Sequence, residues 1–188
     1  LDYELNNAIN QRIEGKREPS TVSAIRSLIK KNNNVLELGS CYGYFTNIMA
    51  HCTGKNGKVV GIEGLPNNYN ILKKNIELNN LKNVSIYNYF LSNRNVESKI
   101  YFKKLVDNPY DGMNEFIKGK NDKLKKGEYI SVKVIRLSNF LKKIKFRLDH
   151  IFMDIEGFEV DVIEDLVKNY ISTKNKPTIL FEIHNPRY

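Results

Sequence analysis

The 188-residue chain is 41% hydrophobic and 27% charged, the balance of one globular domain large enough to bury its own core. No apolar stretch reaches the roughly 20 residues that would span a bilayer. Two cysteines are too few for a disulfide framework, which favours a reducing, cytoplasmic setting. The net charge of +9 suits an anionic partner without identifying one.

The first half of the chain alternates helices and strands. Residues 1–14 and the stretch after Pro19 predict two N-terminal helices, the second capped by Ser20 or Thr21. Three short apolar strands come next, separated by two helices of which Pro66 opens the second. These strands are expected at 35–38, 58–64 and 83–91. The β-α-β-α-β order predicts a parallel sheet with right-handed crossovers.

The second half begins with a different pattern. Residues 98–136 predict a small β insertion, in which two segments alternate with period two, as half-exposed antiparallel strands do, around a lysine-rich loop at 106–128. Parallel order then resumes with a helix, a strand, a helix and a strand at 138–144, 148–156, 158–170 and 178–184. We therefore expect a single α/β domain over 1–188, with helices at 1–33 and a doubly wound, Rossmann-like, mostly parallel core at 34–184.

The first strand runs into the glycine turn of VLELGSCYGYF, residues 35–45. In a doubly wound sheet ligands bind outside the carboxyl ends of the strands, so Glu37 and the 39–43 turn line the crevice. A dinucleotide site needs G-x-G-x-x-G, but Cys41 stands where the middle glycine would let the backbone approach a pyrophosphate. Glu37 would also repel that pyrophosphate, and no Gly-Lys-Ser/Thr follows to make a P-loop.

A cationic nucleoside fits this loop better. S-adenosylmethionine carries an ammonium and a sulfonium, which an acid at the loop mouth attracts. Glu63 ends the second strand, where a carboxylate can accept hydrogen bonds from both ribose hydroxyls. The alternative is an ordinary tight turn beside an incidental acid, which the flanking α/β pattern disfavours.

A second group of polar residues follows the fourth and fifth strands. Asp154 and Glu156 end one strand, Glu182 and His184 end the other, and alternation sends each pair to one side of the sheet. One of these groups can act as general base on an acceptor hydroxyl. Asp154 and Glu182 could instead hold a divalent cation such as Mg²⁺. The acids Glu156 and Glu159 could alternatively stabilise the N-terminus of the following helix.

Four stretches resemble, in order, the FkbM family of class I S-adenosylmethionine-dependent methyltransferases: VLELGSCYGYFT, VVGIEGLPNNYNILKKNIELNNLKNVSIYNYFLSN, DHIFMDIEGFEVDVIEDL and PTILFEIH. IEGFEVDVIE and ILFEIH are the most family-specific, whereas the glycine loop is general to class I enzymes. Glu37 and Gly64 stand where family members usually have Asp and Pro. The resemblance also implies a C-terminal antiparallel edge, for which these residues leave little room. Either the chain is a fragment that lacks this edge, or the edge is covered otherwise.

By position, the resemblance implies a set of cofactor-binding residues: Glu37, Gly39, Ser40, Gly43, Glu63, Gly64, Leu65, Leu91, Ser92 and Asp154. The glycine loop would hold the methionine part of the cofactor, and Glu63 its ribose. Asp154 would lie beneath the methyl donor. The candidate catalytic residues are Asp154, Glu156, Glu182 and His184.

The expected function is O-methylation of a hydroxyl on a sugar, glycan or small metabolite by in-line methyl transfer. A second hypothesis is an RNA methyltransferase, which the net charge and lysine-rich segments favour. The DIEG sequence after the fourth strand disfavours it, since amino-directed nucleic-acid enzymes carry Asn/Asp-Pro-Pro-Tyr/Phe there. A third hypothesis is a cofactor-binding module without turnover. The sequence specifies neither the acceptor nor an oligomeric state.

Overall fold

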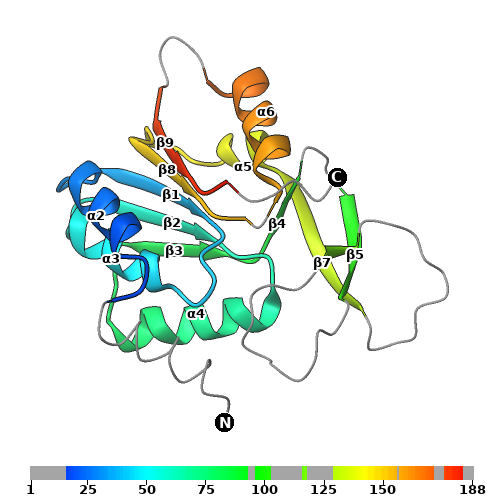
Figure 1. Ribbon diagram of the computed structural model, residues 1–188, viewed down its shortest axis with the longest axis horizontal. Coiled ribbons are helices and arrows are strands. Elements are labelled where there is room, and N and C mark those ends of the chain that lie inside the picture. Colours follow the sequence, from blue (N-terminus) through cyan, green and yellow to red (C-terminus); the bar gives the residue numbers. More distant parts are fainter. Residues whose placement is uncertain are drawn as a thin grey trace.

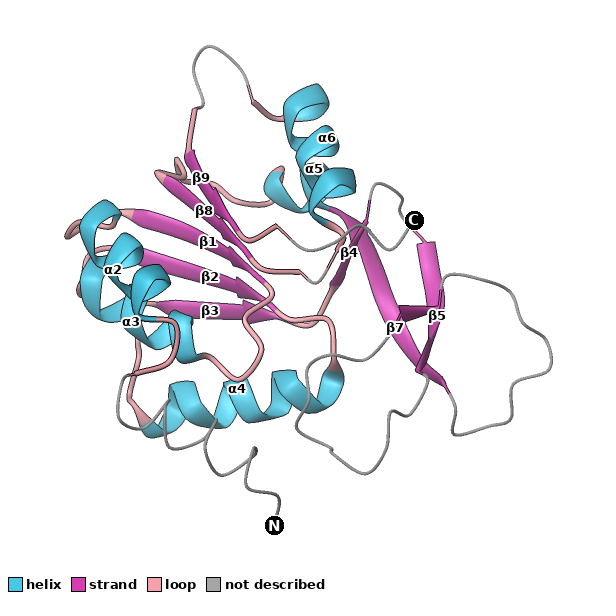
Figure 2. Ribbon diagram, in the orientation of Figure 1, coloured by secondary structure: helices cyan, strands magenta, loops and turns pink. Residues whose placement is uncertain are grey.

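The computed structural model describes residues 16–92, 96–102, 116–117, 129–155, 157–171 and 176–183. The helix predicted at 1–14 and most of the 106–128 loop lie outside these residues. The described chain forms a five-stranded parallel sheet flanked by helices, and a smaller second sheet (Figure 1 and Figure 2). None of the helices within this part is both long and apolar enough to cross a membrane.

The larger sheet has the strand order β3-β2-β1-β8-β9. Its strands are β1 (Asn34–Leu38), β2 (Lys58–Ile62), β3 (Val84–Tyr87), β8 (His150–Met153) and β9 (Thr178–Phe181). All neighbouring strands run parallel. The chain moves outward from β1 to β3 and then returns to the other side of β1, so strand order reverses between β1 and β8. This reversal confirms the predicted doubly wound fold, in which ligands generally bind at such a point of reversal.

Helices cover both faces of the larger sheet (Figure 1). One face carries α2 (Pro19–Leu28), α3 (Tyr44–Thr53) and α4 (Pro66–Leu78), and the other carries α5 (Leu137–Leu141) and α6 (Glu159–Asn169). Alternation sends Val35, Val59 and Phe152 to the first face, and Leu36, Ile151 and Met153 to the second. Both faces are therefore buried, which explains why the strands read as continuous apolar runs.

The smaller sheet has the order β4-β7-β5-β6 (Figure 2). Its strands are β4 (Phe90–Ser92), β5 (Val96–Phe102), β6 (Phe116–Ile117) and β7 (Tyr129–Arg136). The antiparallel pairing of β5 with β7 confirms the period-two prediction. The third strand predicted at 83–91 is confirmed over Val84–Tyr87, but its continuation is wrong, because the chain leaves the larger sheet after Tyr87 and β4 pairs with β7. Asn88 fixes this exit, since its side-chain amide donates to the carbonyls of the turn after β2.

Two strand ends and one helix cap also differ from prediction. β8 ends at Met153 and β9 at Phe181, so the acids that follow lie past their strands, where strand alternation no longer sets direction. The predicted cap by Ser20 or Thr21 is wrong, because α2 begins at Pro19 and has no side-chain cap. Proline suits the first helical position, where its missing N–H would have no partner.

Candidate functional site

The carboxyl edge of the larger sheet brings together residues from four separate motifs. The strand register aligns the last residues of β2, β1, β8 and β9, so the residues that follow them form a row: Glu63, Gly39, Asp154 and Glu182. Backbone hydrogen bonds continue across this row, from Gly39 N–H to Ile62 O at 2.9 Å and from Asp154 N–H to Leu38 O at 2.9 Å. Three acids predicted from distant segments therefore share one edge, beside the strand-order reversal.

Gly39 and Gly43 bend the chain between β1 and α3. Their φ angles are +86° and +89°, in the left-handed region that favours glycine. A Cβ on Gly39 would lie 1.7 Å from the carbonyl oxygen of Asp154, and one on Gly43 would lie 2.7 Å from the Leu72 side chain. Close packing against backbone therefore requires glycine at position 39, whereas at position 43 the backbone conformation carries the requirement, because the end of the Leu72 side chain can shift.

Glu37 lies beneath this glycine loop and is only 1% exposed. Its Oε2 accepts hydrogen bonds from the hydroxyl of Ser40, at 2.9 Å, and from the hydroxyl of Thr46. Burial raises the pKa of the Glu37 carboxyl to about 7, although the hydrogen bonds from Thr46 and Ser40 lower it. The negative charge of Asp154 raises this pKa further. Glu37 thus joins the loop to the first turn of α3, and buried Thr46 is a site residue that the sequence motif contained without marking.

Glu63 joins the glycine loop to the turn after β2. This side chain is 6% exposed, and its two oxygens accept the backbone N–H groups of Cys41 and Leu65, each at 2.8 Å. Burial raises the pKa of Glu63 to about 7, while these two backbone hydrogen bonds and one from the Asn68 side chain lower it. An ionised carboxylate has about four lone-pair positions, so three donors leave room for one more.

The turn after β2 is packed closely against the start of β4. A Cβ on Gly64 would lie 2.3 Å from the ring of Phe90, so the residue that stands where the family usually has proline needs to be glycine here. Asn88 Nδ2 donates to the carbonyl oxygens of Glu63, at 2.8 Å, and Gly64, at 3.0 Å. Sequence reasoning missed Asn88 because it lay inside a strand expected to continue to residue 91. Leu65 is buried directly before α4.

The acids after β8 and β9 differ in exposure. Asp154 is half-buried and Glu182 is exposed. The loop after Asp154 is held by buried Glu159, whose Oε1 accepts the N–H groups of Ile155, at 3.3 Å, and Gly157, at 3.1 Å. Glu159 therefore holds the chain that leads into α6. This agrees with the alternative in which the acid stabilises the start of that helix.

Two of the candidate catalytic residues, Glu156 and His184, lie outside the described residues, and their roles stay predictions. No group of three or more His, Cys, Asp or Glu side chains gathers into a metal site in the part of the chain that the structure describes. A divalent cation held by Asp154 and Glu182 therefore also stays a prediction.

Leu91 and Ser92, carried over as cofactor-binding residues, lie on β4, whose first residue Phe90 packs against Gly64. Leu91 is buried in the core, and Ser92 pairs with Arg136 of β7, so their role toward a cofactor stays a prediction. Tyr87 and Tyr89 flank the exit of β3, with ring planes 11° from parallel and centroids 6.2 Å apart. Tyr87 is exposed and could offer a flat surface to a base.

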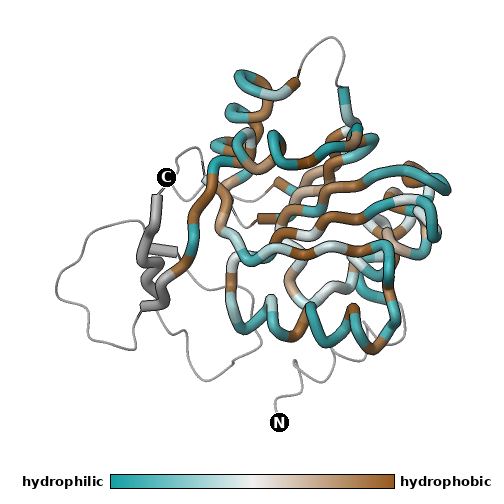
Figure 3. The backbone as a smooth tube through the Cα atoms, turned by 180° about the vertical axis from the view of Figure 1, so that it is seen from behind, coloured by the Kyte–Doolittle hydropathy of each residue, from teal (hydrophilic) through white to brown (hydrophobic). Residues whose placement is uncertain are grey.

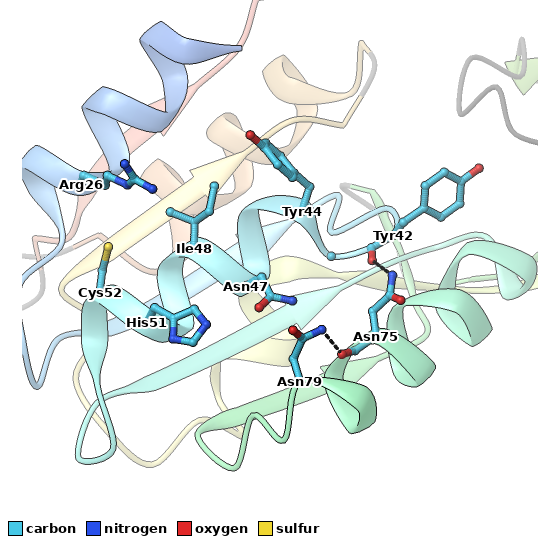
Figure 4. Close-up of a pocket in the computed structure, with 10 residues that line it drawn as sticks. Arg26, Tyr42, Tyr44, Asn47, Ile48, His51, Cys52, Asn75 and Asn79 are labelled. Carbon is cyan, nitrogen blue, oxygen red and sulfur yellow. Dashed lines mark hydrogen bonds between the residues drawn. The ribbon is translucent and has the colours of Figure 1, made fainter. Parts of the chain in front are cut away.

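A cavity of about 750 Å³ lies on the helical side of the glycine loop (Figure 4). Asn47 and His51 of α3 face Asn75 and Asn79 of α4 across part of it. Asn75 Nδ2 donates to the carbonyl oxygen of Tyr42 at 2.7 Å, which braces the loop from behind. None of the four residues in the carboxyl-edge row lines this cavity, but Tyr42 and Gly43 of the glycine loop do, so the cavity and the predicted crevice share that loop.

Residues 32–188 match the family described as Methyltransferase FkbM domain. No curated protein matches the sequence significantly. The precorrin-6Y C5,15-methyltransferase of Geobacter metallireducens GS-15 shares the fold, with a TM-score of 0.51 and 11% identity over 86% of this chain and 61% of that chain. A SAM-dependent O-methyltransferase of Thermotoga maritima has 15% identity over 86% of this chain and 45% of its own, with a TM-score of 0.48.

A protein-L-isoaspartate O-methyltransferase has 29% identity, but over 38% of this chain and 23% of its own, with a TM-score of 0.36. The chain thus spans less than two thirds of the length of each of these three solved structures.

Proposed function

This chain belongs to the FkbM methyltransferase family, and from that membership we propose that it transfers the methyl group of S-adenosylmethionine to a hydroxyl on a sugar, glycan or small metabolite. The observation that carries the proposal is the carboxyl-edge row of Glu63, Gly39, Asp154 and Glu182. This row brings together a glycine turn, an acid proposed to bind a ribose, and two further acids. It lies at the edge where doubly wound sheets generally bind their ligands.

The chemistry of the row suits a cationic nucleoside. Glu37 and Glu63 are buried carboxyls whose pKa values are both raised to about 7, and neither forms an ion pair among the described residues. A cation brought to the loop favours their ionised forms, whereas a pyrophosphate would add negative charge to a site that already resists it. The donor set therefore fits S-adenosylmethionine and does not fit a dinucleotide.

Glu63 is the proposed ribose ligand. One hydroxyl can use its remaining lone-pair position, and a second can replace the amide of Asn68. The backbone hydrogen bonds from Cys41 and Leu65 hold the carboxylate in place while this exchange occurs. Asn88 steadies the same turn from the other side.

When bound, S-adenosylmethionine supplies an already activated methyl group. The residues of this chain then have to hold the acceptor oxygen in line and exclude water, which can supply much of the rate enhancement. Asp154, half-buried next to Gly39, or Glu182, exposed one strand further, is the proposed acceptor for the hydroxyl proton. The same pair would hold a divalent cation, which would lower the pKa of the hydroxyl.

A neutral hydroxylated acceptor is proposed over RNA because of the charge at this edge. The described ionisable side chains of the row are all acids, and an acidic rim repels a phosphate backbone. RNA binding draws most of its affinity from lysine and arginine contacts to phosphates, which the row does not offer.

Calorimetry with S-adenosylhomocysteine tests the cofactor assignment. The intact chain should bind it, and Glu63→Gln should weaken this binding by more than about tenfold. The control variant Glu77→Gln, on the exposed side of α4, should bind it as tightly as the unchanged protein. Failure of the intact chain to bind would remove the cofactor from the proposal.

A labelled-methyl assay tests the acceptor. Pools of hydroxylated glycans, small metabolites and RNA should be compared with and without Mg²⁺. Transfer to RNA alone would contradict the proposed acceptor, and cofactor binding without transfer to any pool would favour a module without turnover.

A further inference from the structure

The edge at which the strands begin, opposite the row of acids, carries a band of exposed lysines. All five strands of the larger sheet are parallel, so the segments that lead into them meet at this one edge. These segments carry Lys31 before β1, Lys55 and Lys58 at the start of β2, Lys82 before β3, Lys145 before β8 and Lys176 before β9. All six are exposed, and none forms an ion pair among the described residues. They are called the basic edge below.

Hydrogen bonds between the leading segments place the members of the basic edge side by side. The backbone N–H groups of Lys58, Val59, Asp149 and Thr178 donate to the carbonyls of Asn33, Asn83, Asn34 and Asp149 at 2.9–3.1 Å. The ammonium of Lys58 also lies 4.5 Å from the centre of the Phe146 ring, next to Lys145. With strands about 4.8 Å apart, the cations spread over roughly 20 Å. In Figure 3 the turns at this end of the sheet are hydrophilic.

The fold uses only part of this charge. Helices α2, α3, α4 and α6 each lead into a strand of this sheet and end at the same edge, and a cation near each carboxyl terminus stabilises the helix dipole. Asp149, the one acid described in these segments, is paired with Arg147 at 2.9 Å and neutralises no lysine of the basic edge. Six lysines exceed what four half-charged helix ends require.

Exposed leucines accompany the basic edge. Leu78, the last residue of α4, is 82% exposed, and Leu28, the last residue of α2, is 37% exposed. Apolar side chains among lysines suit a lipid surface, where the leucine enters the headgroup layer while the ammonium groups meet anionic lipids. Single-stranded nucleic acid is bound on aromatic rings, but the exposed rings described, Tyr87 and Phe181, lie at the opposite edge.

We propose that the basic edge docks the protein on the surface of an anionic lipid bilayer, with Leu78 inserted among the headgroups. The row of acids at the far end of the sheet then faces away from the bilayer. Docking by this edge would therefore localise the protein without placing lipid in the carboxyl-edge crevice. The proposal is independent of the methyl-transfer reaction.

Co-sedimentation of the intact chain with vesicles tests this docking. The protein should pellet with vesicles that contain phosphatidylglycerol and should stay in the supernatant with vesicles of phosphatidylcholine alone. High salt should release the bound protein into the supernatant. Lys55→Glu/Lys82→Glu, at the β2–β3 end of the basic edge and near Leu78, should weaken retention by more than about tenfold. The matched control Lys73→Glu/Lys133→Glu changes the charge equally on α4 and β7 and should retain binding within about threefold.

Leu78→Asn separates insertion from charge. It should weaken retention several-fold while leaving the salt dependence unchanged, since it removes no cation. Thermal unfolding of each variant verifies that it folds. If Lys55→Glu/Lys82→Glu does not fold, the neutral double variant Lys55→Gln/Lys82→Gln takes its place.

Equal retention by neutral and anionic vesicles would overturn the proposal. Equal losses in the two double variants would also overturn it, since general net charge would then account for binding. Release of the protein from anionic vesicles by single-stranded RNA, with tighter binding to the RNA, would assign the basic edge to nucleic acid instead.

Discussion

The carboxylate of Glu63 and the backbone N–H of Cys41 are joined by a 2.8 Å hydrogen bond that ties the turn after β2 to the glycine loop after β1. The other oxygen of Glu63 holds Leu65 in its own turn. A ligand that competes for Glu63 therefore acts on both loops at once. The two loops proposed to bind the cofactor are therefore coupled in the ligand-free protein.

The coupling should be measurable as stability. Glu63→Ala leaves the N–H groups of Cys41 and Leu65 without their acceptor, and each unsatisfied donor costs about 1–3 kcal/mol. We expect urea denaturation to show a free energy of unfolding lower by about 2–4 kcal/mol. Glu77→Ala, exposed on α4, should change it by less than about 0.5 kcal/mol. Equal effects of the two substitutions would show that Glu63 does not link the loops.

Stability of the ligand-free protein should fall as pH rises through neutrality. Burial raises the pKa of Glu37 and Glu63 from 4.5 to about 7 in the folded state. A raised folded pKa contributes stability that is complete below the unfolded value and is lost as pH rises through the folded value. The raised pKa of either carboxyl corresponds to on the order of 3 kcal/mol, and the two losses overlap, because the charge of Glu37 contributes to the raised pKa of Glu63. Thermal unfolding between about pH 5 and pH 8 measures the loss.

Glu37→Gln provides the control for this pH dependence. An amide cannot ionise, so the variant should lose part of the decline in melting temperature that the unchanged protein shows. The same groups predict that S-adenosylmethionine binds more tightly toward pH 8, because its positive charge favours ionised carboxyls. A pH profile of Glu37→Gln that matches the unchanged protein would exclude Glu37 as its source.

The glycine at position 39 should be irreplaceable. In Gly39→Ala the new Cβ would lie 1.7 Å from the carbonyl oxygen of Asp154, at a φ of +86°. We expect a destabilisation of more than about 3 kcal/mol and loss of cofactor binding, because the glycine loop and the chain directly after β8 must both shift. Gly54→Ala is the matched control: its φ is +66°, but nothing lies within 4 Å of the new Cβ. It carries backbone strain alone, because φ +66° with ψ −177° is a conformation almost confined to glycine, and it should cost about 1–3 kcal/mol. Similar costs for both variants would contradict the close-packing requirement.

The acids past β8 and β9 should affect turnover more than binding. If Asp154 accepts the acceptor proton, Asp154→Asn should lower kcat by about 100-fold or more, with S-adenosylhomocysteine affinity nearly unchanged. Glu182→Gln tests the neighbouring acid in the same way, and Glu164→Gln, on the exposed side of α6, is the control. The variant that also removes the acidic limb of the pH–rate profile identifies the base. Parallel losses of affinity and kcat would instead make that residue a cofactor ligand.

Much of the site could be read from local sequence. The apolar runs before Gly39 and Glu63 predicted buried parallel strands, and their ends placed both residues at the carboxyl edge. The departure of Cys41 from the dinucleotide pattern excluded a pyrophosphate. These inferences needed only side-chain periodicity and the chemistry of neighbouring residues.

Long-range contacts decided the rest. Glu37 was expected at the loop mouth, yet Ser40 and Thr46 enclose it beneath the loop, because α3 folds back over β1. The break after Tyr87 depends on Asn88 meeting a turn some 25 residues earlier in the chain. No local pattern records either contact.

The sequence by itself determined the doubly wound order of the five core strands, the glycine turn and the acids at the strand ends, from which a cationic nucleoside is proposed as the ligand. Periodicity and residue chemistry are local properties, so they are legible one segment at a time. Only the tertiary structure decided which acids are buried, which lie side by side and where the lysines gather. A parallel sheet collects all strand ends at one edge and all strand starts at the other. The acids of the carboxyl-edge row and the lysines of the basic edge, which alternate along the sequence, are therefore separated in space.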